Sequence, residues 1–593
     1  MKKKMKKKMK TTAVMIIPIV FLLYSMIGIN QGADVTDTTY SLGNYLFFNE
    51  MTSGWKYAIY LANCVGSLLM TVTGGKLILM NAVTRLFVAA MAIAVFFVLR
   101  KRVPSLILFI GEILAISMCW CPTVILYNYL TYFFLTIAAL LLYSGLQRQK
   151  KSLLLLAGIL LGLNVFVRIS NLTQMSLILV VLYDAWSKRA ETRWGIIFWK
   201  NTLFCVLGYG IGCVGMLGVM LLVEGSDGYL SMISWLYGMF TSSDSNGGYS
   251  MFDMVKSIVG NYVGNVKWLL LMAAGIAAGT AMFLIAKSKM LWIKRILFAG
   301  GVGILFLYFY RNGMFTGLYY SVGSIFCINV VFLLIAYIVL LMALFHRTLE
   351  QEDKLLALLA FLILLFTPLG SNNHVYTIMN NLFFLAPVTL MLFYKMLTPF
   401  LPKEQSFPLA FMSMAFLILF VIQAVMFHSS FVFRDGTNGE KRDTVIAGNS
   451  VMSGMITNAA HAQAIEELEN YTMQNHLQGR YALFYGNIPG AQYLLKMPCA
   501  ISSTWPDLDS YSYEQFLEES TVFENAETLP LFVLSPEVAA YVTEDSEGMQ
   551  YLLIDQHLYE KDQKLDRIRT IILEYNYKEI FGNQEFVLME GSR

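Results

Sequence analysis

The chain carries little charge. Only 14% of its 593 residues are Asp, Glu, Lys or Arg, whereas 57% are hydrophobic. A soluble protein of this length exposes far more charge, so the composition argues against a soluble globular protein. The mean hydropathy of +0.59 indicates instead a polytopic α-helical membrane protein.

Cysteine frameworks and nucleotide-binding motifs are also lacking. The sequence has seven cysteines, of which only Cys499 lies in the C-terminal region. Cys119 and Cys121 are separated by one residue, which suits neither a disulfide nor a zinc site. No Gly-x-x-x-x-Gly-Lys-Ser/Thr motif occurs, which argues against an ATP-driven pump.

Long hydrophobic runs recur along the first 430 residues. A helix of about 20 apolar residues crosses the hydrocarbon core of a bilayer. By this measure the sequence predicts about thirteen transmembrane helices, with ends uncertain by a few residues. They are expected at approximately 11–29, 77–99, 105–119, 124–146, 152–167, 172–187, 201–223, 265–286, 296–310, 321–345, 354–368, 380–398 and 408–428.

Basic residues indicate the orientation. A Lys-rich leader opens the chain and, under the positive-inside rule, holds the N-terminus in the cytoplasm. Alternating spans then place clusters such as Arg100, Lys101 and Arg102 in cytoplasmic loops. We therefore expect a multi-pass protein of the cell membrane with an extracytoplasmic C-terminus. The leader is interpreted as a topology determinant in the lipid bilayer, not as a nucleic-acid site.

Residues 429–593 differ in kind from the membrane domain at 1–428. They hold well over half of the 39 acidic residues. Tyr481–Tyr485, Leu531–Ser535 and Gln584–Met589 are expected to be strands, and Lys564–Glu574 an amphipathic helix. This alternation predicts an extracytoplasmic α/β domain large enough to hold its own core.

Two acids, Asp34 and Asp37, follow the first span and begin an outer loop at about 30–76. Carboxylates near lipid are costly unless they have a function or a partner. Transfer of a sugar from a lipid phosphate needs a carboxylate to accept the proton of the attacking hydroxyl. Either acid is a candidate for this base. A divalent metal, Mg or Mn, bridging the two acids is a further hypothesis.

Isolated cations and polar groups are expected on the same outer face. The transition state also needs cations near the departing phosphate, for which Arg168 and Arg311 are candidates. Together they would suit a negatively charged, lipid-linked substrate. The remaining candidate substrate-binding residues are Tyr40, Arg85, Asn171, Asn372, Asn373 and His374.

For most of these candidates a purely structural role is an alternative to a role in catalysis or substrate binding. Asp34 and Asp37 could cap a helix that starts near Tyr40. Arg168 and Arg311 could be interfacial anchors whose guanidinium groups reach toward water. Arg85 lies within the second span and could form a structural ion pair. His374 alone is typical of a loop residue.

Two motifs resemble a known superfamily. Asp37-Thr38-Thr39-Tyr40 resembles the Asp-Glu-x-x-Tyr that opens the first outer loop of some GT-C membrane glycosyltransferases. Residues 158–168, a Gly-rich run ending in Arg168, resemble another span of these enzymes. The superfamily includes protein O-mannosyltransferases, the lipid A aminoarabinose transferase and the oligosaccharyltransferase catalytic subunit.

The resemblance implies an inverting transferase that uses a polyprenyl-phosphate sugar at the outer membrane face. It assigns the base to Asp37 and the aromatic position to Tyr40. Thr38 departs from the Glu of the motif, and Asp34 could compensate. The acceptor would be a cell-envelope molecule bound with help from the C-terminal domain.

Two alternatives belong to other classes. One is a transporter or flippase of a lipid-linked glycan, which predicts internal repeats and helices broken at mid-membrane; no convincing repeat occurs in the sequence. The other is a non-catalytic scaffold with a GT-C-like fold. Of these classes, we predict a membrane glycosyltransferase.

Overall fold

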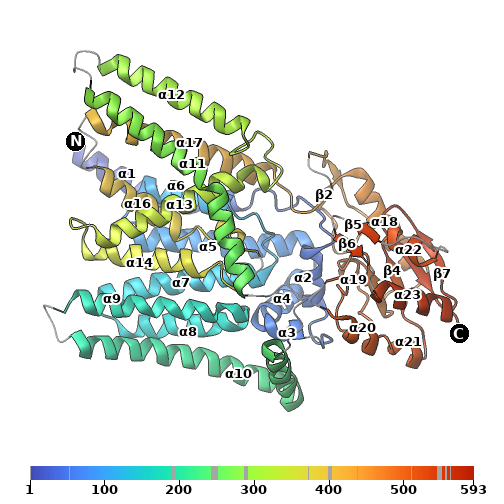
Figure 1. Cartoon of the computed structure of the whole chain (residues 1–593). Coiled ribbons are helices and arrows are strands. Elements are labelled where there is room, and N and C mark those ends of the chain that lie inside the picture. Colours follow the sequence, from blue (N-terminus) through green and yellow to red (C-terminus); the bar gives the residue numbers. More distant parts are fainter. Residues whose placement is uncertain are drawn as a thin grey trace.

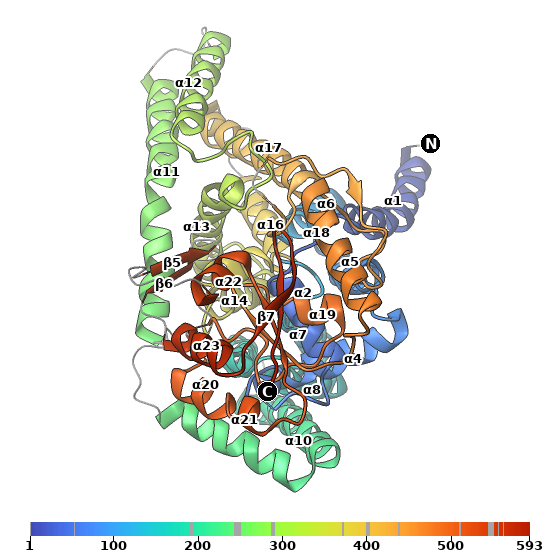
Figure 2. The same ribbon diagram turned by 90° about the vertical axis from the view of Figure 1, so that its right-hand side faces the viewer.

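The computed structural model describes residues 2–593 except 53, 190–193, 242–250, 286–290, 371–372, 399–403, 437–438, 509–510, 544–550, 555–556 and 561–562. A helical bundle forms one part of the molecule, and a smaller α/β domain follows the last long helix (Figure 1). The C-terminal domain covers one end of the bundle, as Figure 2 shows from that side. This confirms the predicted fold class.

The bundle contains the expected membrane helices. Among the described residues, seven helices are long and apolar enough to cross a membrane, and shorter apolar helices accompany them. The seven are α5 (Leu77–Leu99), α7 (Leu126–Arg148), α10 (Trp194–Thr241), α11 (Met251–Ile285), α12 (Leu291–Arg311), α13 (Gly323–Phe345) and α17 (Phe407–Ser430). The other bundle helices are α1 (Lys2–Ser25), α6 (Ser105–Ser117), α8 (Lys151–Val167), α9 (Leu179–Ser187), α14 (Gln351–Phe366), α15 (Tyr376–Met379) and α16 (Leu385–Leu397).

One expected span differs in structure. The run at 172–187 is not a continuous α-helix but a 3-10 helix, η1 (Ile169–Ile178), followed by the short α9. Asn171 and Gln174 of η1 are buried and bond to Asn164 of α8. Hydropathy measures composition along the run and does not register these local polar contacts.

The first loop, residues 30–76, is also helical. It contains α2 (Asp37–Leu46), α3 (Gly54–Ala58) and α4 (Tyr60–Thr73). A buried ion pair joins Lys56 Nζ to Glu224 Oε2 of α10 at 2.8 Å, and the Tyr60 hydroxyl donates to the same carboxylate. The loop is therefore a packed layer between the bundle and the C-terminal domain (Figure 1).

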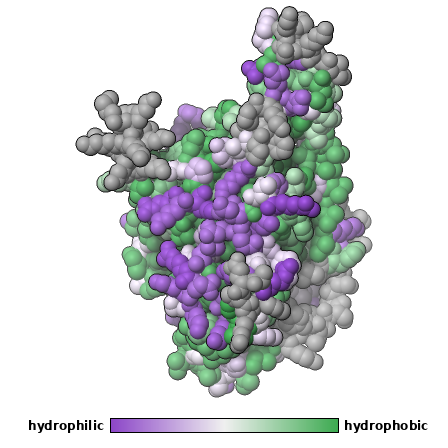
Figure 3. All heavy atoms as spheres, turned by 90° about the vertical axis from the view of Figure 1, so that its left-hand side faces the viewer, coloured by the Kyte–Doolittle hydropathy of each residue, from purple (hydrophilic) through white to green (hydrophobic). Residues whose placement is uncertain are grey.

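The opposite end of the bundle is polar (Figure 3). There the carboxylate of Asp353 is buried and pairs with Arg102 Nε at 2.8 Å and Lys395 Nζ at 2.7 Å. Arg102 also contacts Glu350 Oε2 at 2.6 Å. These contacts join the start of α14 to the α5–α6 turn and to α16.

Helices α8 and α10 pack against each other, and both helices contribute glycines to the contact. A Cβ at Gly158 would lie 2.1 Å from the carbonyl oxygen of Cys205, and one at Gly208 would lie 2.1 Å from that of Leu155. The backbones thus approach more closely than any side chain allows, which is the small-residue packing typical of membrane helices. The Gly-rich run at 158–168 has this packing role.

This contact predicts a position-specific effect within α10. We expect Gly208→Ala to lower stability by about 1–3 kcal/mol, because the methyl group overpacks a helix contact. Gly210→Ala is the matched control, since a Cβ there meets nothing within 4 Å and alanine favours helix. Thermal midpoints of the detergent-purified proteins should fall only for Gly208→Ala; equal midpoints would contradict the packing.

The C-terminal domain is built on a four-stranded sheet in the order β3-β4-β8-β7. Its strands β3 (Ala482–Tyr485) and β4 (Leu531–Leu534) are parallel. β8 (Val587–Glu590) pairs antiparallel with β4, and β7 (Lys578–Gly582) pairs antiparallel with β8. The expected strands and the expected helix, α23 (Gln563–Glu574), are present. The remaining elements are β1 (Thr444–Val445), β2 (Ile456–Thr457), α18 (Ala459–Gln474), α19 (Ala491–Leu495), α20 (Tyr513–Glu519), α21 (Val522–Asn525), α22 (Pro536–Thr543), β5 (Tyr551–Ile554) and β6 (His557–Glu560).

Candidate active site

Asp34 forms the N-terminal cap of α2. Its Oδ1 accepts hydrogen bonds from the backbone N–H and the hydroxyl of Thr36, at 2.8 and 2.5 Å, and its Oδ2 accepts from the Thr38 N–H at 2.8 Å. Burial raises the pKa of Asp34, while these donors lower it. The capping interpretation therefore describes Asp34, and its carboxylate orients the first turn of α2.

Asp37, one turn further, pairs with an arginine from the far end of the sequence. Its Oδ2 lies 2.7 Å from Nη1 of Arg434, in the segment after α17, and its side chain is 31% exposed. Burial raises the pKa of Asp37 to about 6, although Arg434 opposes the rise; the negative charge of Asp34 adds to it. A carboxylate with this pKa is ionised at neutral pH and still accepts a proton readily.

A cavity of about 460 Å³ lies beside Asp34. Asp34 and Thr38 line it, and the buried hydroxyl of Thr38 makes no hydrogen bond within the described part of the chain. Its volume is in the range of small-molecule sites. Polar and apolar groups share the wall, among them Asn30, Gln31, Asn81, Arg85, Val88, Ile116, Trp120, His428 and Phe433.

Arg85 of α5 lies in the cavity wall and also holds the end of α1. Its guanidinium donates to the carbonyl oxygens of Ser25, Ile27 and Gly28, at 3.3 Å for Ser25 and 3.1 Å for Gly28. These carbonyls end a helix, where a cation is favourable. Arg85 thus positions the chain that leads into the first loop, and no carboxylate pairs with it among the described contacts.

Arg168 and Asp37 both interact with the same tyrosine, Tyr127. The guanidinium is 5.7 Å from the ring centre of Tyr127, and Tyr127 interacts electrostatically with both Arg168 and Asp37. The Arg168 side chain makes one long bond, 3.4 Å, to the Gly370 carbonyl. Within the part of the chain that the structure describes, no other hydrogen bond to the Arg168 side chain is found.

Tyr40 and Asn171 lie in packed surroundings. The Tyr40 ring contacts Trp505 of the C-terminal domain edge-on, with centroids 5.4 Å apart. The Asn171 amide donates to the Thr131 hydroxyl at 2.7 Å and to the Asn164 carbonyl at 2.9 Å. Asn171 therefore joins η1 to α7 and α8.

The remaining predicted residues lie elsewhere. Arg311 is exposed at the end of the peripheral helix α12, and no contact among the described residues joins it to Asp37. Asn372 lies outside the described residues, whereas Asn373 is exposed. His374 has a positive φ of 47°, and burial lowers its pKa.

Both acids have partners in the structure. The oxygens of Asp34 accept bonds from Thr36 and Thr38, and Asp37 pairs with Arg434. Within the described ranges no group of three or more His, Cys, Asp or Glu side chains gathers as metal ligands would. A divalent ion bridging Asp34 and Asp37 stays a prediction.

The C-terminal domain binds the chain on both sides of Asp34 through main-chain bonds. Gly32 N–H donates to the Ile456 carbonyl at 2.9 Å, and Ile456 N–H donates to the Asn30 carbonyl at 2.8 Å. Gly490 N–H donates to the Val35 carbonyl at 2.9 Å. In Figures 1 and 2, α2 accordingly lies against α19.

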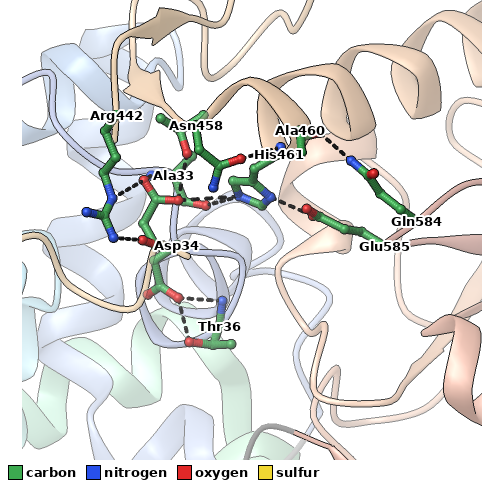
Figure 4. Close-up of polar contacts among 11 residues, drawn as sticks. Ala33, Asp34, Thr36, Arg442, Asn458, Ala460, His461, Gln584 and Glu585 are labelled. Atoms are coloured by element: carbon green, nitrogen blue, oxygen red, sulfur yellow. Dashed lines mark hydrogen bonds and ion pairs between the residues drawn. The ribbon is translucent and has the colours of Figure 1, made fainter. Parts of the chain in front are cut away.

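Side chains of the same domain bracket Ala33. Its N–H donates to Asp435 Oδ2 at 3.1 Å, and its carbonyl lies 2.8 Å from Nε2 of His461. The other ring nitrogen of His461, Nδ1, lies 2.5 Å from Glu585 Oε2. Figure 4 shows His461 between Ala33 and Glu585. Asp435 also accepts from the Thr457 hydroxyl at 2.6 Å.

The sequence interpretation missed these partners. Arg434 and Asp435 directly follow the last span, at the same end of the bundle as Asp34 and Asp37, and this position was the available signal. His461 and Glu585 lie in a helix and a strand-flanking turn that carry no motif.

Comparison with known proteins finds solved structures of similar arrangement. The crystal structure of ArnT from Cupriavidus metallidurans bound to undecaprenyl phosphate matches 98% of this chain and 98% of its own, at 10% identity and a TM-score of 0.42. No protein-family model and no curated protein matches the chain. A likeness of this degree does not identify a substrate, so the function is argued from the residues.

Proposed function

We propose that this protein is a membrane glycosyltransferase. It transfers a sugar from a polyprenyl-phosphate-linked donor to a hydroxyl of a cell-envelope acceptor, with inversion at the anomeric carbon. The observation that carries the proposal is the carboxylate of Asp37. It is ionisable and paired with Arg434, and its neighbours in the sequence, Asp34 and Thr38, line a cavity with polar and apolar walls.

In this mechanism Asp37 is the general base. The acceptor oxygen attacks the anomeric carbon and gives its proton to the Asp37 carboxylate, while the bond from that carbon to the phosphate oxygen breaks. The polyprenyl phosphate leaves with the electron pair. A pKa of about 6 keeps Asp37 ionised at neutral pH, and Arg434 orients it.

Arg168 is the cation that we assign to the leaving phosphate. Charge grows on this phosphate in the transition state, and a fixed guanidinium stabilises it. Arg168 interacts electrostatically with the same tyrosine, Tyr127, as Asp37 does, and among the described residues its side chain makes one long hydrogen bond. Arg311 has no comparable connection to Asp37.

The experiment is a donor-consumption assay. Protein in nanodiscs is incubated with polyprenyl-phosphate sugars extracted from membranes, and free polyprenyl phosphate is measured by mass spectrometry. We expect wild-type protein to release it and Asp37→Asn to release far less. The control is Glu524→Gln, because Glu524 also pairs with an arginine, at 3.1 Å, but lies in α21. Movement of the donor across the bilayer without consumption would identify a flippase instead.

The partner of Asp37 gives a separate prediction on pH dependence. Removing the charge in Arg434→Gln takes away the interaction that lowers the pKa of Asp37. The acidic limb of the activity profile should then move from about pH 6 to higher pH, by roughly one unit for a partly exposed pair. Arg434→Lys should keep the limb near its wild-type position. An unmoved limb in Arg434→Gln would show that another group titrates.

A further inference from the structure

The contacts of His461 fix its protonation state. One ring nitrogen faces a carboxylate, Glu585 Oε2, at 2.5 Å, and the other faces the Ala33 carbonyl oxygen at 2.8 Å. Both neighbours are acceptors. A neutral imidazole has one N–H and one lone pair, so either tautomer would point a lone pair at an acceptor. Only the imidazolium donates to both.

The charges around the ring support this state. Glu585 faces His461 from the turn before β8, and Asp435 Oδ1 lies 4.0 Å from Nε2 in the segment after α17. Arg442 pairs with the other side of Asp435, at 3.5 Å. Asp34 follows Ala33 in the first loop. Burial is the largest single influence and lowers the pKa of His461, but the hydrogen bond and charge of Glu585, the Ala33 carbonyl and the charge of Asp435 together raise it to about 9.

The ring acts on a single residue of the first loop. Ala33 is fully buried; Asp435 accepts its N–H and His461 donates to its carbonyl. The next residue, Asp34, caps α2, and α2 starts at Asp37. A chain of contacts therefore runs from Glu585 through His461, Ala33 and Asp34 to the first turn that carries the proposed base.

We propose that His461, as an imidazolium, is a positioning residue that locks the first loop to the C-terminal domain and so fixes the site of Asp37. The lock is pH-dependent. Since the folded-state pKa is raised above the ordinary 6.5, the stabilisation is complete below about pH 6.5 and is lost as the pH rises through 9. The catalytic part of this inference rests on the proposed function, whereas the lock itself does not.

Hydrogen–deuterium exchange on the full-length protein in nanodiscs tests the lock. The readout is the protection factor of peptides covering residues 30–39, whose amides at Gly32, Ala33 and Thr38 are bonded. Wild-type protection should be level below about pH 6.5, fall progressively between pH 6.5 and 9, and be level again above 9. In His461→Gln it should be at least tenfold lower and independent of this titration. Glu585→Gln should move the fall to lower pH, because it removes the charge that raises the pKa.

The matched control is His476→Gln, an exposed histidine after α18, which should behave as wild type. The lock is refuted if residues 30–39 of His461→Gln keep wild-type protection. It is also refuted if peptides covering α23 lose protection as much as residues 30–39 do, because the effect would then not be local. Turnover measurements test the catalytic part of the inference separately from the lock itself. We expect His461→Gln to lower kcat more than the donor KM and to abolish the alkaline fall near pH 9. If the wild-type protein shows no turnover, the proposed transferase activity is wrong. The exchange measurements then still test whether His461 holds the first loop to the C-terminal domain.

Discussion

Asp37→Asn is expected to lower kcat for sugar transfer by about 10²–10⁴-fold, the usual contribution of a general base. The amide cannot accept the proton of the acceptor hydroxyl, but it preserves the shape of the side chain. The donor KM should change little, because Asp37 acts on the proton and not on the lipid phosphate. The measurement is initial-rate kinetics at pH 7.5 in nanodiscs.

Folding of this variant is a necessary control. The ionised carboxylate is disfavoured by burial, since its pKa is raised to about 6, so Asn should not destabilise the fold at neutral pH. Thermal midpoints of Asp37→Asn and wild type should therefore be similar. Full activity in a well-folded Asp37→Asn protein would remove Asp37 as the base.

The second large effect is expected at Asp435. Its side chain is 1% exposed and accepts bonds from the Ala33 N–H and the Thr457 hydroxyl, while Arg442 pairs with it. Asp435→Ala removes a buried charge that faces Arg442 and the acceptor of the buried Ala33 N–H, which costs about 3–5 kcal/mol. The thermal midpoint should fall on the order of 10 °C, and exchange in residues 30–39 should increase.

Two further substitutions serve as comparisons for the thermal midpoint of Asp435→Ala. Asp435→Asn keeps an acceptor but loses the charge, so its midpoint should lie between those of wild type and Asp435→Ala. Asp443→Ala removes an exposed acid whose partner, Lys441, is also exposed, and it should leave the midpoint unchanged. An Asp435→Ala protein as stable as Asp443→Ala would show that the clamp on Ala33 contributes little.

The bundle was predictable because hydrophobic runs are a local property. Runs such as 77–99 and 321–345 became α5 and α13 almost residue for residue. Apolar β-rich segments likewise predicted β3 and β4. The break at η1 was not predictable, since it depends on buried amides of Asn171 and Gln174 meeting Asn164 in space.

The candidate site was predictable only in part. Asp34 and Asp37 stood out because acids beside a membrane span are costly, and the sequence left open the cap that Asp34 forms. Arg168 and Arg311 were expected near the departing phosphate, and the pairing of Asp37 with Arg434 was not expected. The contacts between this loop and the C-terminal domain join residues about 400 apart, such as Ala33 and Asp435, 402 positions apart. No periodicity or spacing encodes such a pairing.

The pH dependence of kcat/KM tests the role of Asp37 most directly. For wild-type protein, kcat/KM should fall tenfold per pH unit below about 6, where Asp37 becomes protonated, and be level above it. The slow residual reaction of Asp37→Asn should show no such limb. A wild-type profile without a limb near pH 6, or the same limb in both proteins, would contradict the assignment of Asp37 as the base.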